Sequence, residues 1–172
     1  MTLKNKELSI WLIGPSAAGK TTISKLLYEE IKDKMNFAIV DGDQVRSLYE
    51  NNLGYDKFSR SKNTKRYINL VNWLNNFKIS SIVAVISPFE KDRDICRKEI
   101  NNYFEIYLKS SREERIRRDK KKLYAPAIKG EKINVVDVDI PFEHPTKCNL
   151  EINTENKDPK KIVKEIREKL GI

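Results

Sequence analysis

The sequence predicts an α/β fold with a five-stranded parallel sheet and helices on both faces. Two observations lead to this fold class. Short apolar runs alternate with segments of helical periodicity, and no repeat, low-complexity tract or linker divides the chain. With 172 residues the chain is long enough to bury a core around such a sheet, so we expect one domain over residues 1–172.

The strands of this sheet are predicted from apolar runs of only a few residues. They are Leu8–Ile13, Phe37–Val40, Ile79–Ile86, Tyr103–Leu108 and Leu150–Ile152. The helical patterns between the runs begin near Lys20, Gln44, Ser61, Phe89 and Ser111. We expect a last helix after Asp158, which can cap it, with Pro159 at the first helical position, where its missing N–H costs nothing.

One segment fits neither pattern. Residues 119–146 are basic and show no periodicity, and they contain Pro126, Gly130, Pro141 and Pro145. A loop of this length in a compact domain is usually disordered or functional. We therefore expect a mobile lid over about residues 119–146.

The cysteines and tryptophans favour ordinary structural roles. Cys96 and Cys148 lie in no CxxC motif and no Cys/His cluster, which argues against a metal site or a disulfide framework. Trp11 falls in the first apolar run and is expected in the core. Trp73 is expected to pack a long helix against the sheet.

Composition limits the partners and the compartment. The net charge of +9 would allow nucleic-acid binding, but no nucleic-acid motif accompanies the basic run Arg112–Lys122. Polyanionic nucleotide ligands, or plain solvated surface, explain the same charge. The apolar stretches are too short to cross a bilayer, and no apolar segment of a signal peptide follows Met1–Leu8. We expect a cytoplasmic protein.

The first apolar run is followed by a phosphate-binding sequence. Residues Gly14–Thr21 read G-P-S-A-A-G-K-T, a complete Walker A motif between an apolar run and a helical pattern. Its backbone N–H groups can surround phosphates at the positive end of the helix. Lys20 can reach the β- and γ-phosphates, and the Thr21 hydroxyl can bind Mg²⁺. The predicted ATP-binding residues are Gly14, Ser16, Ala17, Ala18, Gly19, Lys20, Thr21 and Thr22.

The motif alone does not separate a kinase from a GTPase, a motor or an ATP sensor. No NKxD-like guanine signature follows, and the second apolar run ends instead in Asp41-Gly42-Asp43. One carboxylate could accept or orient the proton of a reacting hydroxyl, and the other could hold Mg²⁺ through water. The alternative is an Asp-Gly turn in which Asp43 caps a helix. We take Lys20, Asp41 and Asp43 as candidate catalytic residues and leave open which aspartate is the base.

A series of further motifs follows in order. They are Val45-Arg46, Leu53-Gly54-Tyr55, Arg60 with Asn63 and Arg66, Ile86-Ser87-Pro88-Phe89 with Asp92-Arg93-Asp94, Arg118-Asp119 with Leu123-Tyr124, and Pro141-Phe142-Glu143 with Pro145. With these motifs the chain resembles the adenylylsulfate (APS) kinases from about Ile10 to Thr154. That family uses ATP to phosphorylate the ribose 3′-hydroxyl of adenosine 5′-phosphosulfate. The resemblance implies a P-loop kinase fold and a second, acceptor substrate.

The resemblance also implies where the acceptor binds. Arg46, Arg60 and Asn63 are donors suited to its anionic 5′-group, although each arginine could equally be an exposed helix-surface charge. In the lid region, Lys121 and Arg118 could meet ATP phosphates or adenine, which adds Arg118 to the ATP-binding set. The predicted acceptor-binding residues are Asp43, Arg46, Tyr55, Arg60, Asn63, Ser87, Lys121 and Val135.

The departures from the family pattern concern the acceptor side. The family clamps the adenine of the acceptor between two aromatics, of which Tyr55 is one and Val135 replaces the other. The missing face is worth about 1–3 kcal/mol per stacked base. Lys120-Lys121-Lys122 replaces Pro-Lys-Gly, and Asp137 replaces a glycine. These changes favour a smaller base, as in the cytidine diphosphoramidate kinases, a branch of the family that phosphorylates the 3′-hydroxyl of a cytidine nucleotide.

The sequence thus predicts an ATP-dependent nucleotide 3′-kinase with Mg²⁺ as cofactor. The best interpretation of its acceptor is cytidine diphosphoramidate. The alternatives are an APS kinase and, from another class, a non-catalytic ATP-binding regulator. We expect ATP and a small anionic nucleotide as partners, with neither nucleic acid nor membrane. A homodimer is left open, since the sequence does not decide the oligomeric state.

Overall fold

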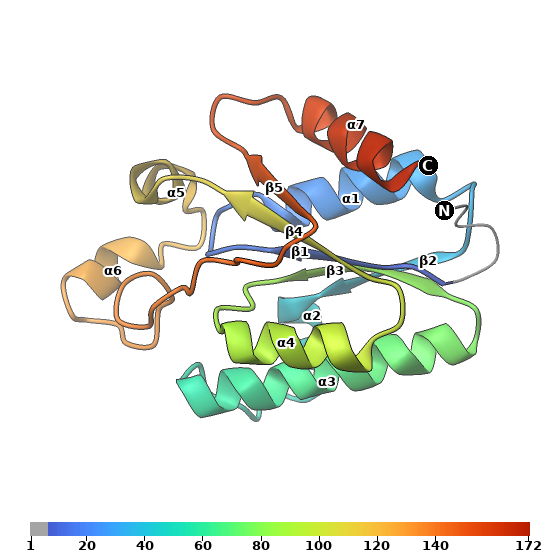
Figure 1. The fold of residues 1–172 in the computed structure, drawn as a ribbon. Coiled ribbons are helices and arrows are strands. Elements are labelled where there is room, and N and C mark those ends of the chain that lie inside the picture. Colours follow the sequence, from blue (N-terminus) through green and yellow to red (C-terminus); the bar gives the residue numbers. More distant parts are fainter. Residues whose placement is uncertain (1–6) are drawn as a thin grey trace.

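The computed structural model describes residues 7–172. Residues 1–6 lie outside the described residues. They include the beginning of the domain expected over residues 1–172 and most of the segment Met1–Leu8, which was considered as the start of a signal peptide. The described part contains five strands and seven helices, and each strand is followed by one or two helices (Figure 1). They are β1 (Ser9–Ile13), α1 (Lys20–Ile31), β2 (Phe37–Asp41), α2 (Gly42–Leu48), α3 (Lys57–Asn76), β3 (Ser80–Val85), α4 (Glu90–Glu99), β4 (Tyr103–Lys109), α5 (Arg112–Arg118), α6 (Tyr124–Ile128), β5 (Leu150–Asn153) and α7 (Pro159–Leu170).

The strands form one parallel sheet, as predicted. Their order is β2-β3-β1-β4-β5, so β1 lies in the middle and pairs with β3 on one side and with β4 on the other. The connection from β1 crosses to the β2 edge, and the chain later passes β1 to reach β4. In open parallel sheets, ligands bind beyond the carboxyl ends of the strands where the order reverses in this way.

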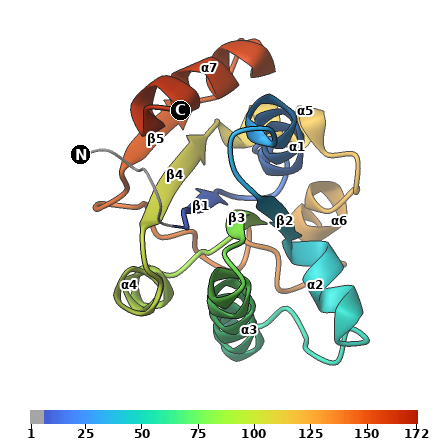
Figure 2. The same cartoon turned by 90° about the vertical axis from the view of Figure 1, so that its right-hand side faces the viewer.

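The two faces of the sheet are covered by different helices (Figure 2). Because alternate residues of a strand point to opposite faces, β1 contributes to both cores. Its Ile10 and Leu12 pack with α1 and α7. Its Trp11 and Ile13 pack with α3 and α4. Trp11 is fully buried and lies against Tyr67 and Tyr103, which confirms its predicted place in the core.

Helices α5 and α6 lie beyond the carboxyl ends of the strands, and the chain after α6 runs back along the sheet to the start of β5 (Figure 1). The segment expected as a lid, residues 119–146, contains α6 and an isolated parallel bridge between Val136 and Ile140. It therefore has more local structure than its lack of periodicity indicated. Its mobility stays a prediction.

Two expectations from the sequence were wrong in detail. Helix α3 begins at Lys57 and not near Ser61, because the Asp56 carboxylate caps it and accepts hydrogen bonds from Ser59 N at 2.9 Å and Ser59 Oγ at 2.6 Å. Trp73 does not pack against the sheet, since it is 57% exposed and meets the ring of Phe77 edge-on. None of the helices within residues 7–172 is long and apolar enough to span a membrane.

Candidate active site

A cavity of about 580 Å³ lies beyond the carboxyl ends of β1, β2 and β3. The phosphate-binding loop and the segment from Lys132 to Val136 both contribute to its wall. Most of the predicted site residues line it, namely Ser16, Ala17, Gly19, Lys20, Thr21, Thr22, Asp41, Asp43, Arg46, Tyr55, Arg60, Asn63, Ser87, Arg118, Lys121 and Val135. The residues predicted to bind ATP and those predicted to bind the acceptor thus line the same cavity. Gly14 and Ala18, both predicted to contact ATP, are not in its wall.

Gly14 serves the shape of the loop instead. A Cβ at this position would lie 2.7 Å from the carbonyl oxygen of Leu108, and its φ of 149° is one that side chains rarely adopt. Ala18 is fully buried beneath the loop. Gly19 has a φ of 99° and forms the N-cap of α1, so its peptide turns the chain into the helix. The glycines of the motif therefore set the close approach of the loop to β4 and its entry into α1.

Lys20 lies inside the curl of this loop. Its Nζ donates hydrogen bonds to the carbonyl oxygens of Gly14, at 2.8 Å, and of Pro15, at 2.7 Å. Burial, followed by the positive charge of Lys121, lowers the pKa of Lys20 to about 7, although Asp43 and Asp41 act in the opposite direction. The charge of this ammonium group is therefore sensitive to any anion that enters the loop.

The two aspartates have different environments. Asp41 is the N-cap of α2: its Oδ1 accepts from the Asp43 backbone N–H at 2.9 Å, and its Oδ2 accepts from Thr21 Oγ1 at 3.0 Å. Asp43, which we had considered as a cap, does not cap α2, and its carboxylate pairs with Lys121 Nζ. Asp41 is thus held between the phosphate loop and α2, whereas Asp43 is exposed and reaches the lid segment.

A hydroxyl and two carboxylates near a phosphate loop suit Mg²⁺. This ion prefers oxygen ligands, keeps several waters and uses one or two carboxylates together with substrate phosphates. Thr21 Oγ1 and Asp41 Oδ2, 3.0 Å apart, form such a partial donor set. Across residues 7–172 there is no group of three or more His, Cys, Asp or Glu side chains that would form an all-protein cage. The donor set therefore fits a metal that arrives with a phosphate ligand.

Arg46 and Tyr55 lie together on the acceptor side. Arg46 is buried, and its Nη1 donates to the carbonyl oxygens of Leu53 and Gly54, both at 3.0 Å. Its guanidinium lies 4.4 Å from the centre of the Tyr55 ring. Arg46 thus fixes the loop that carries Tyr55 and also lies over the ring on which we expected the base to stack. A base would have to use the other face of that ring.

Arg60 and Asn63 approach the same place from α3. Arg60 Nη2 donates to the Asn134 carbonyl oxygen at 2.8 Å, and its guanidinium lies 5.6 Å from the Tyr55 ring centre. Desolvation, followed by the charge of Arg46, lowers the pKa of Arg60 to about 10. Asn63 donates to the Tyr67 hydroxyl, and its buried Oδ1 has no protein partner among the described residues.

Arg46 and Arg60 together make this part of the cavity electropositive. Neither guanidinium makes a salt bridge to a carboxylate within the described chain. Two adjacent cations that repel each other and lack a counter-charge favour binding of an anion. This region is therefore a second electropositive surface, separate from the phosphate loop in the same cavity.

Arg118 and Ser87 lie at the cavity wall with mainly structural contacts. Arg118 donates to Thr154 Oγ1 at 3.1 Å and to the Thr154 carbonyl oxygen at 2.9 Å, and it pairs with Glu114 at 2.5 Å. Ser87 has a φ of 48°, in the left-handed region, and its buried Oγ has no partner within residues 7–172. Strained residues of this kind gather at binding sites because the surrounding structure has to hold them.

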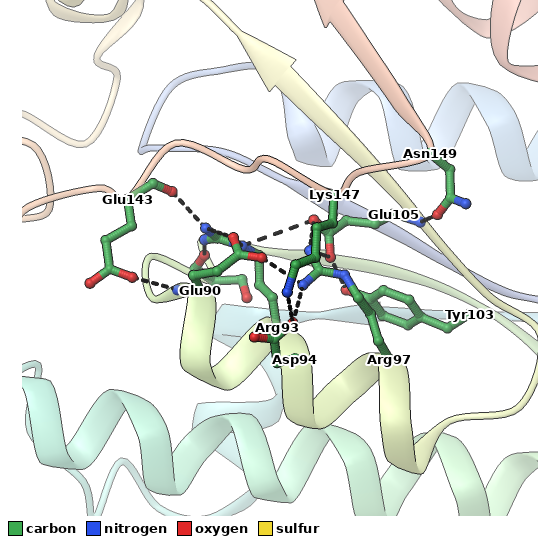
Figure 3. A network of polar contacts seen from close by, with 10 residues as sticks. Glu90, Arg93, Asp94, Arg97, Tyr103, Glu105, Glu143, Lys147 and Asn149 are labelled. Carbon is green, nitrogen blue, oxygen red and sulfur yellow. Dashed lines mark hydrogen bonds and ion pairs between the residues drawn. The ribbon is translucent and has the colours of Figure 1, made fainter.

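Figure 3 shows how the end of the lid segment is held against α4. The fully buried Arg93 of α4 donates to the carbonyl oxygens of Ser87, at 2.6 Å, and of Glu143, at 2.7 Å. It also pairs with Glu90, whose backbone N–H donates to Glu143 Oε2 at 2.6 Å. The motif residues around Arg93 and Glu143 thus lock two chain segments onto α4.

Sequence reasoning missed several residues of the cavity wall. Among them are Tyr67, Lys132, Ile133 and Asn134. Tyr67 follows Asn63 by four residues, so the two share one face of α3, and this spacing could have identified it. The segment around Lys132 has no periodic pattern, and only its place before Val135 connects it to the acceptor side.

Comparison with known proteins identifies the family. The family model for adenylylsulphate kinase matches residues 6–153. The chain belongs to the adenylylsulphate kinase family. A probable adenylyl-sulfate kinase of Pyrococcus abyssi is 35% identical over 152 residues, which is 88% of this chain and 87% of the relative. A cytidine diphosphoramidate kinase of Campylobacter jejuni is 39% identical over 152 residues, with 88% of each chain covered.

The fold agrees with this family. The APS kinase of Mycobacterium tuberculosis, solved with AMPPNP and APS, superposes with a TM-score of 0.90 at 24% identity and covers 97% of this chain and 99% of its own. The P-loop kinase fold and the resemblance to adenylylsulphate kinases are thus confirmed, and the protein is a phosphotransferase.

Proposed function

We propose that this adenylylsulphate kinase family member transfers the γ-phosphoryl group of ATP to the ribose 3′-hydroxyl of a nucleotide with a charged 5′-group, and that this nucleotide is cytidine diphosphoramidate. The observation that carries the proposal is the pair of arginines, Arg46 and Arg60, in the cavity that also holds the phosphate loop. An enzyme that only hydrolysed or sensed ATP would not need a second anion-binding surface.

The preference for a pyrimidine comes from Val135. This side chain lies in the cavity wall and is 6% exposed, and it offers a branched aliphatic surface where the family has an aromatic ring. A purine gains more than a pyrimidine from a second stacking face, because its ring system is larger. The loss therefore weakens an adenine acceptor more than a cytosine acceptor. The likeness to the Campylobacter jejuni enzyme supports the same choice.

The chemistry is direct in-line transfer, with no phosphoenzyme. The phosphate loop and Lys20 hold the triphosphate, and the arginine pair holds the 5′-group of the acceptor, so most of the catalysis is positioning and charge stabilisation. Asp41 or Asp43 accepts or orients the proton of the attacking hydroxyl. Thr21, with Asp41 or Asp43 through water, would hold Mg²⁺, which would neutralise charge on the β- and γ-phosphates.

An acceptor panel with MgATP tests the proposal. Cytidine diphosphoramidate, CDP, APS and plain nucleosides are compared by ADP release, and phosphorus NMR identifies a 3′-phosphate product. We expect the highest kcat/KM for a cytidine 5′-diphosphate-like acceptor. If APS has a kcat/KM well above every cytidine nucleotide, the acceptor is APS. If calorimetry with an ATP analogue detects no acceptor at all, a regulator that only binds ATP becomes the better interpretation.

The variant Val135→Phe tests the reason for the preference. Restoring an aromatic face should raise kcat/KM for APS by about tenfold relative to the cytidine acceptor, within the 1–3 kcal/mol of one stacked base. Ile133→Phe is the matched control, because Ile133 also lines the cavity but is 72% exposed. An equal effect of both variants would mean that added apolar surface, and not stacking at position 135, changes the preference.

The APS kinase alternative also has support in the comparisons. The Pyrococcus abyssi relative carries that name, and it covers as much of the chain as the cytidine enzyme does. The remaining face of Tyr55 could stack on adenine as well as on cytosine. The acceptor panel separates the two candidates directly.

A further inference from the structure

Asp137 has an unusual backbone conformation that its own side chain holds. It lies in the turn of residues 134–140 with a φ of 72°, in the left-handed region that favours glycine. Its Oδ2 accepts from Arg112 Nε at 3.1 Å and also from Arg115 Nη2, and both arginines come from α5. Its backbone N–H donates to the Ile140 carbonyl oxygen at 2.7 Å. The conformation of the turn therefore depends on contacts with α5.

Arg115 connects this carboxylate to the phosphate loop. Its side chain is buried, and its Nε donates to the Tyr124 hydroxyl at 3.2 Å. Tyr124 is fully buried, and its hydroxyl donates to the carbonyl oxygen of Ser16 at 3.0 Å. Asp137 is the carboxylate that Arg115 contacts in the described chain, since the other partners of Arg115 are a hydroxyl and the Ser110 carbonyl. Three buried or half-buried side chains thus link the phosphate loop to the turn.

The far end of the same turn forms the acceptor side of the cavity. Asn134 and Val135 are in the cavity wall, and the Asn134 carbonyl accepts from Arg60 at 2.8 Å. The Asp139 carboxylate accepts from both of their backbone N–H groups, at 2.5 and 2.6 Å, so the turn is internally stiff. A displacement of Asp137 must therefore also move Val135 and Asn134, whose carbonyl oxygen accepts the hydrogen bond from Arg60.

We propose that Asp137 is a positioning residue that couples the phosphate loop to the acceptor side through Arg115 and Tyr124. ATP phosphates contact the loop that contains the Ser16 carbonyl, so their binding sets the position of Tyr124, of Arg115 and of the turn. By thermodynamic linkage, an acceptor held by Arg60 and Val135 must tighten ATP by the same factor by which ATP tightens the acceptor. The identity of the second ligand as a nucleotide acceptor rests on the proposed function, but the link itself does not.

Hydrogen exchange tests the link without any acceptor. A non-hydrolysable ATP analogue with Mg²⁺ should slow exchange of the Val135 and Asp137 amides at least several-fold in the wild type. In Tyr124→Phe, which lacks the hydroxyl that reaches Ser16, the analogue should leave exchange at these amides unchanged. Tyr28→Phe is the matched control, because Tyr28 lies on α1 and its hydroxyl has no hydrogen bond within residues 7–172. Unchanged exchange in the wild type, or an equal loss in the control, overturns the proposal.

Calorimetry then measures the coupling itself. The affinity of cytidine diphosphoramidate or APS is measured with and without the analogue. Asp137→Asn keeps a residue that tolerates the left-handed region, but it removes the charge. We expect the analogue to tighten the acceptor about tenfold in the wild type and less than about twofold in Asp137→Asn and Tyr124→Phe.

If a variant only lost stability, it would bind the acceptor more weakly both with and without the analogue, and the factor by which the analogue tightens the acceptor would keep its wild-type value. A wild-type factor in Asp137→Asn and Tyr124→Phe therefore contradicts the proposal. If Asp137→Asn does not fold, Tyr124→Phe decides alone. If the exchange result holds but no nucleotide acceptor binds, the link stands and the proposed function fails.

Discussion

At the scale of single residues, Lys20 is expected to take up a proton when ATP binds. Its pKa is lowered to about 7, so at pH 8 the side chain is mostly neutral in the free protein. Bound phosphates favour the ammonium form and raise this pKa again. ATP binding at pH 8 should therefore take up close to one proton, and the ATP affinity should fall as the pH rises above about 7.

Calorimetry in two buffers of different ionisation enthalpy measures this uptake. Lys20→Met should bind ATP more weakly and take up no proton. A wild-type enthalpy that does not depend on the buffer would mean that Lys20 stays charged in the free protein.

Arg60 provides a second prediction at this scale. Its guanidinium lies close to Arg46 and donates a hydrogen bond to the lid segment, but it makes no hydrogen bond to the phosphate loop within the described residues. Arg60→Ala should raise the KM of the acceptor by more than about tenfold, since hydrogen bonds to charged groups contribute roughly 1.5–3 kcal/mol. The KM of ATP should change less than about twofold, because Arg60 makes no contact with the phosphate loop.

Steady-state kinetics with each substrate varied in turn decides this point. Lys57→Ala, on the exposed start of α3, is the control for a lost positive charge on the same helix. An equal rise in the KM of the acceptor and the KM of ATP for Arg60→Ala would mean that Arg60 maintains the shape of the cavity and does not bind the acceptor.

At the scale of elements, the ion network on α4 is expected to stabilise the fold. Glu105 of β4 is fully buried and accepts from Arg97 at 2.8 and 3.0 Å and from the Tyr103 hydroxyl at 2.6 Å (Figure 3). Replacing the Glu105 carboxylate by an amide removes the buried counter-charge of Arg97, which keeps only Glu90 and Asp94 as ion-pair partners in the described chain. Glu105→Gln should therefore lower the free energy of unfolding by about 3 kcal/mol.

Urea unfolding measures the loss. Asp94→Asn is the matched change at the edge of the same network, where the Asp94 side chain is 48% exposed, and it should cost less than about 1 kcal/mol. Equal costs at both positions would mean that burial does not control the strength of this network.

The elements also show how far the sequence could lead. The strands were predictable because buried parallel strands are continuous apolar runs, and α7 was predictable from Asp158 and Pro159 at its start. Helix α6 was not predictable, because five residues with Pro126 among them are too few to show a helical period. The start of α3 was missed because Asp56 follows the segment Asn51–Tyr55, whose two asparagines and Gly54 are typical of a loop.

The site residues that belong to a sequence motif were predictable. The contacts that depend on how distant segments fold together were less so. The phosphate loop and Asp41 follow from their places after β1 and β2. The contact of Arg46 with the Tyr55 ring, and the hydrogen bond from Arg60 to Asn134, join segments far apart in the sequence. Such pairs depend on tertiary packing, which local patterns do not encode. Trp73 shows the same limit, since helical spacing alone did not tell the buried face of α3 from the exposed one.

At the scale of the whole molecule, charge should steer the substrates. The chain has a net charge of +9, and the cavity wall has seven cationic side chains against three carboxylates. An electropositive cleft raises the association rate of anionic ligands, and salt screens this effect. Between about 50 and about 500 mM NaCl, kcat/KM for both substrates should fall by about tenfold, while kcat at saturation changes little.

Steady-state kinetics over this salt range checks the prediction with two matched variants. Lys132→Gln, in the cavity wall, should reduce the salt dependence. Lys164→Gln should not, because Lys164 is an exposed residue of α7 outside that wall. A salt dependence that is the same in both variants would mean that the overall charge, and not the cavity, attracts the substrates.

The packing of α1 against α7 has a consequence for synthesis on the ribosome. The phosphate loop opens α1, and the buried face of α1 packs with Ile162, Val163 and Ile166 of α7. Residues 32–158 separate these two helices, so on the order of ten seconds of translation pass between them at typical rates. During that time the nascent α1 lacks the apolar contacts that α7 provides. Part of the apolar face of α1 therefore stays exposed until α7 emerges.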